Sequence, residues 1–354
     1  MASPRDAVRP GNDPAPTGGS LVPHGFDDLP GWFEDDHDAL LRAFRASAAH
    51  ALERPYRSRP LTPTDGFERV ARASLRGIGA PRDFFEEHFV PHRILGGPEK
   101  LTGYYEPVLA ASRTLTERFD TPLHRPPSDL VRTPDGGYGR LENGRVVPHH
   151  DRAAVMDGAL SGSDLTIAYL DAVDAFIAHI QGSARLRLPD GTVRVTFAGK
   201  SGHRYTSLGR VLCERLRLHP KEMTADRLYG WLRDHPRERN ELLRLNRSYI
   251  YFRVSEQGAD GPVAAAGIPL VPVRSLAVDR TLHSFGLPFH IVTRDALPGG
   301  IGPLRRSLVA HDTGSAIVGP ARGDIFMGRG AEAGFHAGRI HHEAAFHVLL
   351  PRRA

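Results

Sequence analysis

Apolar residues recur at helical spacing along the first part of the chain. Between residues 34 and 54 they fall on one face of a helix, which Pro55 ends. The apolar stripe consists of Leu40, Leu41, Phe44 and Ala48. Similar patterns predict further helices over residues 67–75, 81–89, 165–180, 206–218, 225–233 and 236–245. Ser163 or Asp164 is placed to cap the helix at 165–180.

Other segments have the pattern of strands. Residues 101–108 are β-like and aromatic, and residues 184–188 and 192–198 alternate around Asp190-Gly191, a dipeptide that favours a tight hairpin turn. Residues 121–148 are rich in proline, which is typical of surface loops. Beyond residue 248 the predicted strands are 249–254, 270–277, 288–293, 307–311, 324–327 and 345–350. About six short strands without long helices predict a small closed barrel.

Length and composition are those of a globular protein with two domains or one large barrel. The chain has 354 residues, of which 40% are hydrophobic and 25% are charged, so it can form an ordinary core. No run of roughly 18 apolar residues is present, so no membrane-spanning helix is predicted. The net charge of +5 is small and scattered, which disfavours nucleic acid as a partner.

The N-terminus and the cysteine content limit the possible compartments and sites. Residues 1–25 are rich in proline, glycine and aspartate and predict a disordered tail. They show neither the apolar segment of a signal peptide nor a cysteine that could accept a lipid. Cys213 is the only cysteine, which excludes an intrachain disulfide and a multi-cysteine zinc site. Its apolar neighbours predict a core position.

Two aspartates near the C-terminus are the strongest candidates for chemistry. Asp312 lies in the segment 311–319 and Asp324 in the segment 323–328, each at a strand edge beside glycine. Glycine beside a polar residue on a strand often marks the close approach of a ligand or of another backbone. Such aspartates can instead simply cap turns. Asp-Thr-Gly-Ser is also the signature of aspartic proteases, but that chemistry needs two copies and the chain has one.

Several segments together resemble one known family. The segments 274–280, 287–288, 309–317 and 323–326 resemble the 3D module, which is named for three aspartates, here Asp279, Asp312 and Asp324. The Gly-Tyr-Tyr-Glu-Pro sequence in 101–107, the Gln-Gly-Ser sequence in 180–185, and the segments 198–200 and 246–252 add to this match. Over about residues 90–350 the chain is similar to membrane-bound lytic transglycosylase A.

The resemblance implies a mainly β fold with accessory helices. A double-psi β-barrel domain would take residues 26–108 and 248–354, including the N-terminal helices. A second, β-rich domain would be inserted as residues 109–247. The substrate groove for a glycan strand would lie between the two domains.

The resemblance also implies an activity, that of a peptidoglycan lytic exotransglycosylase, which is a murein lyase. Such an enzyme cleaves the β-1,4 bond between N-acetylmuramic acid and N-acetylglucosamine without water, because the muramoyl 6-hydroxyl closes a 1,6-anhydro ring. Ordinary glycosidases need two carboxylates, but an internal nucleophile lets one carboxyl act as acid and then as base. Asp324 matches the catalytic acid/base of the family, and Asp312 would support it by raising its pKa. Whether cleavage occurs at chain ends or within chains stays open.

Further residues are assigned to substrate binding. They are Thr102, Tyr104, Tyr105, Glu106, Asp279, Gly314 and Ser315. Side chains alternate along a strand, so only one of the two tyrosines is expected to face a sugar. Asp279 could equally have a purely structural role. No metal or cofactor is expected, because the second histidine of the segment 342–347 stands one position too late for a helical zinc motif.

The expected partners are the glycan strands of peptidoglycan, and the protein is expected to be a monomer. The resemblance places it in the periplasm or at the outer membrane. One alternative is a catalytically inactive barrel protein that binds peptidoglycan. An aspartic protease is the less favoured alternative.

Overall fold

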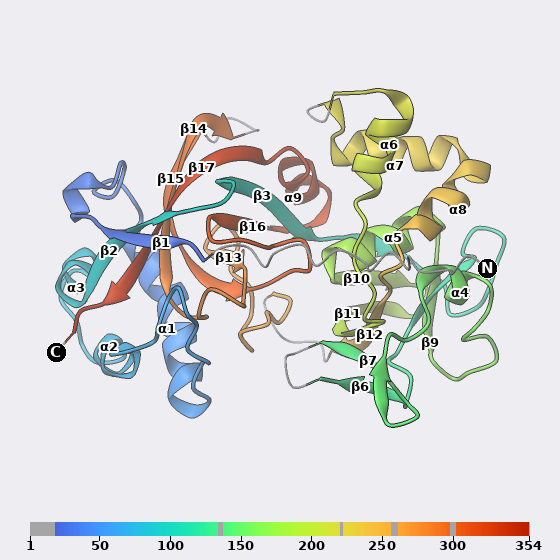
Figure 1. The fold of residues 1–354 in the computed structure, drawn as a ribbon, viewed down its shortest axis with the longest axis horizontal. Coiled ribbons are helices and arrows are strands. Elements are labelled where there is room, and N and C mark those ends of the chain that lie inside the picture. The colour runs from blue at the N-terminus through green and yellow to red at the C-terminus, as the bar shows by residue number, and fades with distance from the viewer. Residues whose placement is uncertain (1–17, 134–136, 220–221, 256–260, 298–301, 354) are drawn as a thin grey trace, which may run out of the picture.

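The computed structural model describes most of the chain as two lobes placed side by side (Figure 1). The described residues are 18–133, 137–219, 222–255, 261–297 and 302–353. One lobe contains the β-barrel and the N-terminal helices, and the other contains the middle of the chain. Strands account for 35% and helices for 28%, which confirms the mainly β prediction.

Six strands close into a barrel. In ring order they are β17 (His341–Pro351), β14 (Pro288–Leu297), β15 (Gly302–Asp312), β13 (Ser275–Val278), β16 (Arg322–Arg329) and β3 (Lys100–Glu106), which pairs again with β17. The pairs β13–β15 and β16–β3 are parallel, and the other neighbours are antiparallel. Five of the six strands come from the C-terminal part of the chain, so the predicted closed barrel is confirmed.

Two further strands extend the sheet beyond the barrel. β2 (Phe89–Leu95) pairs with β17, and β1 (Ser20–Pro23) pairs with β2. The predicted tail over residues 1–25 falls mostly outside the described residues, but its last part is wrong, because residues 20–23 form β1. Short exposed segments look disordered from composition alone, whereas here the ladder of backbone hydrogen bonds orders the strand.

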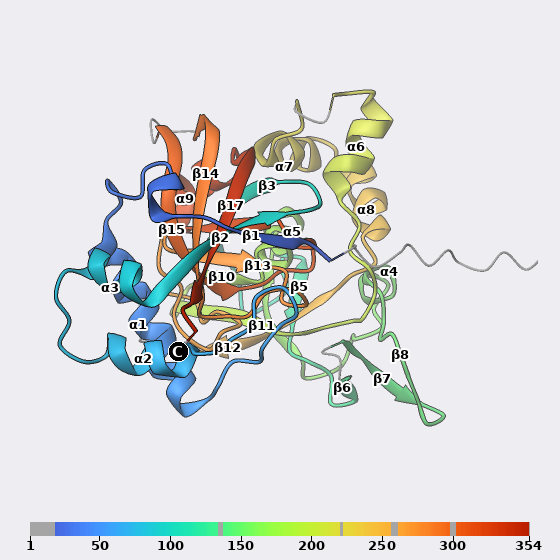
Figure 2. The ribbon, with the colours of Figure 1, turned by 60° about the vertical axis from the view of Figure 1, so that its left-hand side comes forward.

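Three helices cover the flank of the barrel that faces away from the second lobe (Figures 1 and 2). They are α1 (His37–Glu53), α2 (Phe67–Ser74) and α3 (Pro81–His88). Asp36 caps α1 by accepting a hydrogen bond from the backbone N–H of Ala39. The predicted stripe of α1 is confirmed, because its four residues are buried in the same core as the inner side chains of the barrel.

The second lobe is built around an independent sheet. Its order is β12 (Ile250–Ser255), β11 (Gly191–Lys200), β10 (Ser183–Leu188) and β4 (Val108–Ala110), and it includes the predicted hairpin β10–β11. Smaller sheets pair β5 (Thr121–His124) with β9 (Thr166–Leu170), and join β6 (Leu130–Arg132), β7 (Tyr138–Glu142) and β8 (Arg145–Val147). The helices are α4 (Arg152–Met156), α5 (Ala172–Gln181), α6 (Leu208–Leu216), α7 (Ala225–Asp234) and α8 (Pro236–Leu245).

The chain leaves the barrel after β3 and returns to it at β13. The division into 26–108 with 248–354, and 109–247, stays a prediction. The strand pairing adds one detail, because β12 pairs with β11 in the sheet of the second lobe rather than with a barrel strand. The sequence pattern predicts that residues 249–254 form a strand, but it cannot name the partner of that strand.

Two predicted segments differ from the structure, and the sequence pattern does not predict one helix. The helix predicted over 165–180 is wrong at its start, since β9 occupies 166–170 and Asp171 caps the shorter α5. The loop predicted over 121–148 contains the short strands β5 to β8. α9 (Gly330–Ala337) carries two glycines that mask its helical pattern. Among the described residues, no helix has the length and apolar character needed to cross a bilayer.

Candidate active site

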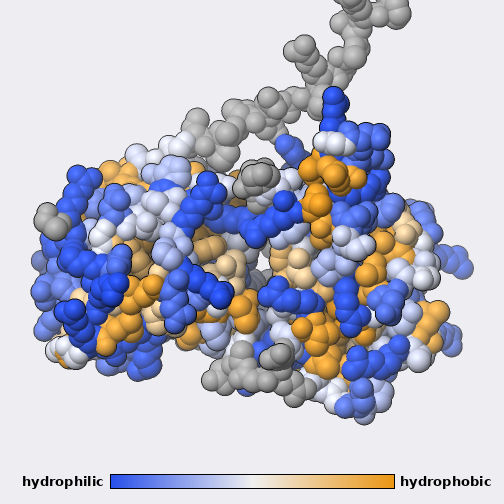
Figure 3. Space-filling view, turned by 90° about the horizontal axis from the view of Figure 1, so that it is seen from below, coloured by the Kyte–Doolittle hydropathy of each residue, from blue (hydrophilic) through white to orange (hydrophobic). Residues whose placement is uncertain are grey.

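Two adjacent barrel strands, β3 and β16, place Thr102, Tyr104 and Asp324 on one face. β3 lies between β16 and β17, with Thr102 opposite Asp324 and Tyr104 opposite Phe326. Side chains two residues apart on a strand point to the same face, so Thr102, Asp324 and Tyr104 share one face. Figure 3 shows that the molecular surface is hollowed between the two lobes.

A short chain of hydrogen bonds orients the Asp324 carboxyl group. Arg322 Nη2 donates to Thr102 Oγ1 at 2.8 Å, and Thr102 Oγ1 donates to Asp324 Oδ1 at 2.5 Å. Because a guanidinium can only donate, the single hydroxyl hydrogen of Thr102 must point to Asp324. Oδ1 is therefore an acceptor, and a proton on this carboxyl group belongs on Oδ2. Within the described part of the chain, no hydrogen bond engages Oδ2.

The surroundings of Asp324 raise its pKa, so that more of this carboxyl group stays protonated at a given pH than in an exposed aspartate. Burial raises the pKa of Asp324 to about 6, and the charge of Asp312 adds to this increase. Arg322, the Thr102 hydrogen bond and Lys100 act in the opposite direction and lower the pKa. A carboxylic acid with a pKa near 6 can both give and take a proton at physiological pH.

Asp312 is held by groups on both of its oxygens. Tyr104 donates its hydroxyl to Oδ2 at 2.9 Å, and the backbone N–H of Ala265 donates to Oδ1 at 3.0 Å. Burial raises the pKa of Asp312, whereas these hydrogen bonds lower it. Burial and the charge of Asp312 raise the pKa of Tyr104 well above its ordinary value, so Tyr104 stays a donor. Asp312 is thus a fixed neighbour of Asp324.

The glycine that precedes Asp324 allows a close approach within the barrel. A Cβ atom at Gly323 would stand 2.7 Å from a ring carbon of Phe346 and 2.9 Å from Leu276. Such contacts are closer than carbon atoms tolerate, so this position accepts only glycine without displacing the core. Side chains of the core therefore approach Gly323, and the close approach of a ligand or of another backbone beside Asp324 stays a prediction.

The two tyrosines have different surroundings. The Tyr104 ring lies 5.3 Å from the Phe326 ring, on the face that carries Asp324. The Tyr105 ring packs on Gly334 of α9, and the backbone N–H of Tyr105 donates to Gln181 Oε1 at 3.0 Å. The alternation along β3 therefore directs Tyr104, rather than Tyr105, toward the candidate aspartates Asp312 and Asp324.

Glu106 requires a correction. The sequence assigns it to substrate binding, but its side chain is fully buried and forms ion pairs with Arg194 at 2.7 Å and Arg185 at 3.0 Å. Both arginines lie on strands of the second lobe, while Glu106 ends β3 of the barrel. A carboxylate saturated in this way cannot reach a sugar, so Glu106 joins the two lobes structurally.

Asp279 is also corrected to a structural role. It is 4% exposed, and its Oδ1 accepts hydrogen bonds from the backbone N–H and the hydroxyl of Thr281. Its Oδ2 accepts the backbone N–H of Gly319 at 2.8 Å. Asp279 therefore holds the loop that follows Asp312 in place, and no oxygen is left for a ligand.

Gly314 and Ser315 are exposed on the loop that follows Asp312, as a substrate contact would require. Lys200 Nζ, from β11 of the second lobe, donates to Ser315 Oγ at 3.2 Å. This contact joins the two lobes next to the Asp312 loop. Binding of substrate by Gly314 and Ser315 stays a prediction.

Sequence reasoning missed two cations beside Asp324. Arg322 stands two residues before Asp324 on β16, and Lys100 stands opposite Arg322 on β3. A usable signal was present for Arg322, because a residue two positions from a catalytic residue on a strand shares its face. No such signal existed for Lys100, which is 224 positions from Asp324 in sequence and reaches it only through strand pairing.

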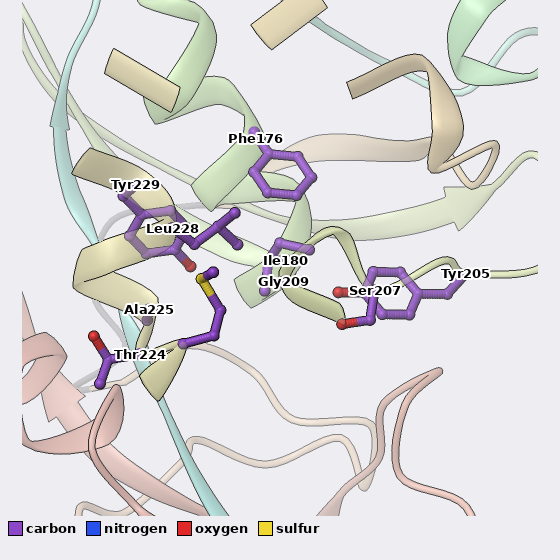
Figure 4. Close-up of a pocket in the computed structure, with 10 residues that line it drawn as sticks. Phe176, Ile180, Tyr205, Ser207, Gly209, Thr224, Ala225, Leu228 and Tyr229 are labelled. Carbon is purple, nitrogen blue, oxygen red and sulfur yellow. The ribbon is translucent and has the colours of Figure 1, made fainter. Parts of the chain in front are cut away.

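A separate pocket of about 210 Å³ lies in the second lobe, between α5, α6 and α7 (Figure 4). Its lining residues are Phe176, Ile180, Tyr205, Ser207, Gly209, Met223, Thr224, Ala225, Leu228 and Tyr229. The lining contains hydroxyl groups but no carboxylate, so the pocket lacks the carboxyl group that the candidate chemistry needs.

Metal ligation finds no support in the described ranges. They contain no group of three or more histidine, cysteine, aspartate or glutamate residues that could hold a metal ion.

Family comparisons agree with the two-part organisation of the chain. Residues 100–253 match the model of the MltA specific insert domain, and residues 274–350 match the model of the 3D domain. The insert-domain match begins with β3 and ends within β12.

Individual relatives come from several bacteria. The chain is 32% identical, over 72% of its length, to membrane-bound lytic murein transglycosylase A of Escherichia coli, and the alignment covers 66% of that relative. A membrane-bound lytic murein transglycosylase of Agrobacterium tumefaciens is 41% identical, with a TM-score of 0.86 and coverage of 94% of this chain and 98% of that one. The structure of E. coli MltA with bound chitohexaose has a TM-score of 0.69 at 25% identity and covers both chains completely.

Proposed function

The chain belongs to the lytic murein transglycosylase A family, and from this membership we propose that it is a peptidoglycan lytic transglycosylase. The proposed substrate is the glycan strand of peptidoglycan, cut at the β-1,4 bond between N-acetylmuramic acid and N-acetylglucosamine. The observation that carries the proposal is Asp324, a carboxyl group with a pKa of about 6 that is anchored through Oδ1 and free at Oδ2.

One carboxyl group suffices for the proposed reaction. Asp324 Oδ2 donates its proton to the glycosidic oxygen as the bond from that oxygen to the muramoyl C1 breaks. The muramoyl 6-hydroxyl oxygen then bonds to C1 and closes the 1,6-anhydro ring, and its proton passes to Asp324. The carboxylic acid is restored, and no water is consumed.

The arrangement of Asp312 supports this mechanism over ordinary hydrolysis. A hydrolase needs a second carboxylate that attacks the sugar or activates water. Both oxygens of Asp312 accept hydrogen bonds from the protein, from Tyr104 and Ala265. We therefore assign Asp312 an electrostatic role, in which its charge helps to keep Asp324 protonated.

The products of the reaction test the proposal. Incubation of the protein with purified peptidoglycan in water labelled with ¹⁸O is expected to yield 1,6-anhydromuramoyl ends without the label, as read by mass spectrometry. Labelled reducing ends would contradict the proposal and indicate a hydrolase. Release of neither product would favour the alternative of an inactive binding protein.

The pH profile provides a second prediction. Because the first step needs protonated Asp324, activity is expected to fall about tenfold per pH unit above the pKa of about 6. Arg322 lowers this pKa, so Arg322→Gln is expected to move the alkaline limb to higher pH. The measurement is the rate of anhydro-product release from a soluble muropeptide between pH 4 and pH 9.

Arg72→Gln is the matched control for this profile, since it removes one positive charge from the exposed surface of α2. Its alkaline limb should coincide with that of the unmodified protein. If the alkaline limb of Arg322→Gln stays in place or moves to lower pH, Arg322 does not lower the pKa of Asp324 as proposed.

We also propose where the protein acts. Peptidoglycan lies outside the cytoplasm, and the curated relatives are named as membrane-bound, so action in the periplasm or at the outer membrane follows from the proposed substrate. The proposed active form is a monomer.

A further inference from the structure

Two positive side chains stand next to the catalytic pair on the same face of the barrel. Lys100 and Arg322 are directly opposite each other on β3 and β16, as Thr102 and Asp324 are. They precede that pair by two residues on each strand, which corresponds to about 6.6 Å along the strands. The cations therefore lie within one sugar-sized step of the proton donor.

Neither cation is neutralised within the described part of the chain. Lys100 Nζ makes no hydrogen bond or ion pair there, and Glu343, opposite Lys100 on β17, forms none with it. Arg322 donates to Thr102 Oγ1 and to the backbone oxygen of Gly323, and it also has no carboxylate within ion-pair distance. Asp324 is the carboxyl group whose charge acts on both cations.

This arrangement is costly for the protein alone. Both side chains are half-buried, and burial together with the charge of Arg322 lowers the pKa of Lys100. His341 lies nearby on β17, and burial and then the charge of Lys100 lower its pKa, so it adds no negative charge that could balance the two cations. Two adjacent like charges with reduced solvation favour the binding of an anion between them. When Asp324 is protonated for the first step, it supplies no negative charge to the two cations.

We propose that Lys100 and Arg322 form a subsite for a carboxylate carried by the muramoyl residue of the substrate. The inference rests on the proposed function and deepens it. The muramoyl residue differs from N-acetylglucosamine by a 3-O-lactyl group, which ends in a free carboxylate in stem-free glycan. In stem-bearing glycan the lactyl group is amide-linked to a peptide that carries carboxylates of its own.

The subsite distinguishes muramoyl from other amino sugars. A half-buried lysine facing a carboxylate gives a charge-assisted hydrogen bond, which contributes to affinity only when the ligand carries that charge. Chitohexaose consists of N-acetylglucosamine alone and has no carboxylate. Its affinity should therefore not depend on Lys100, whereas the affinity for muramoyl ligands should.

The experiment measures binding rather than turnover. In an Asp324→Asn background, the dissociation constants of stem-free murein oligosaccharide, stem-bearing oligosaccharide and chitohexaose are compared by calorimetry with and without Lys100→Gln. Lys100→Gln is expected to weaken binding of at least one carboxylate-bearing ligand about tenfold, and to leave chitohexaose within about twofold. If only the stem-free ligand loses affinity, the carboxylate bound at the subsite is that of the lactyl group. If only the stem-bearing ligand loses affinity, it is a carboxylate of the peptide stem.

Three controls make the result decisive. Lys100→Arg keeps the charge and should restore most of the affinity, and Arg72→Gln, which removes an exposed charge on α2, should change none of the three constants. Far-UV circular dichroism of Lys100→Gln verifies that the variant is folded. The proposed subsite would be refuted if Lys100→Gln changed the dissociation constants of all three ligands equally, or changed none of them.

Failure of the subsite and failure of the proposed function are distinguishable. Anhydro products from the unmodified protein without ligand-selective loss in Lys100→Gln would refute the subsite alone. Ligand-selective loss without anhydro products would refute the proposed reaction and leave the subsite in place.

Discussion

Replacing Asp324 by asparagine is expected to lower the rate of 1,6-anhydro-product release about a thousandfold, within the range that acid–base catalysis contributes. Asparagine keeps the size of the side chain, and its oxygen can still accept the hydrogen bond from Thr102. It cannot donate an acidic proton to the glycosidic oxygen or accept one from the 6-hydroxyl. The measurement is quantitative mass spectrometry of products released from purified peptidoglycan.

A matched aspartate serves as the control for this experiment. Asp83→Asn changes an exposed carboxylate on α3, far from the catalytic face, and should keep the full rate. The rate of Asp312→Asn should lie between the rates of these two variants, because the role proposed for Asp312 is electrostatic and involves no proton transfer. If Asp324→Asn retains more than about a tenth of the activity, another residue must be the acid.

The second large effect is expected from Glu106→Ala, which should lower the free energy of unfolding by about 3–5 kcal/mol. The substitution leaves Arg194, which is 6% exposed, without its carboxylate in a buried setting. It also removes the ion pair with Arg185 and thereby two of the contacts between β3 and the second lobe. Urea unfolding followed by circular dichroism measures the change.

Glu68→Ala provides the comparison, because Glu68 pairs with Arg72 on the surface of α2, where both side chains are more than half exposed. Exposed pairs of this kind contribute at most about 1 kcal/mol. If Glu106→Ala and Glu68→Ala have similar unfolding midpoints, the structural role assigned to Glu106 is wrong.

Local patterns predicted most of the secondary structure correctly. The stripe of α1, the hairpin β10–β11 and the barrel strands after β13 each depend on side-chain periodicity or on turn residues that are close together in sequence. The prediction was wrong where strand pairing overrides periodicity. Residues 166–170 have apolar positions that also fit a helix, but they pair with β5.

The candidate site was predicted only in part. Asp324 and Asp312 could be identified because short motifs surround them, and Thr102 and Tyr104 because they belong to another such motif. The roles of Glu106 and Asp279 could not be predicted, because a carboxylate in a motif looks the same whether it faces a ligand or buried arginines. Burial and partners decide between these roles, and both depend on residues far away in the sequence.

The sequence by itself determined most of the strand and helix pattern, the family and the identity of the candidate acid, Asp324. The tertiary structure alone decided how that acid is held and charged. Arg322 and Thr102 are separated by 220 positions, yet parallel pairing of β16 with β3 makes them neighbours. Electrostatic and hydrogen-bond energies fall steeply with separation, so the position of a proton and the pKa of its group depend on distances of a few ångströms. Only the closed barrel sets those distances.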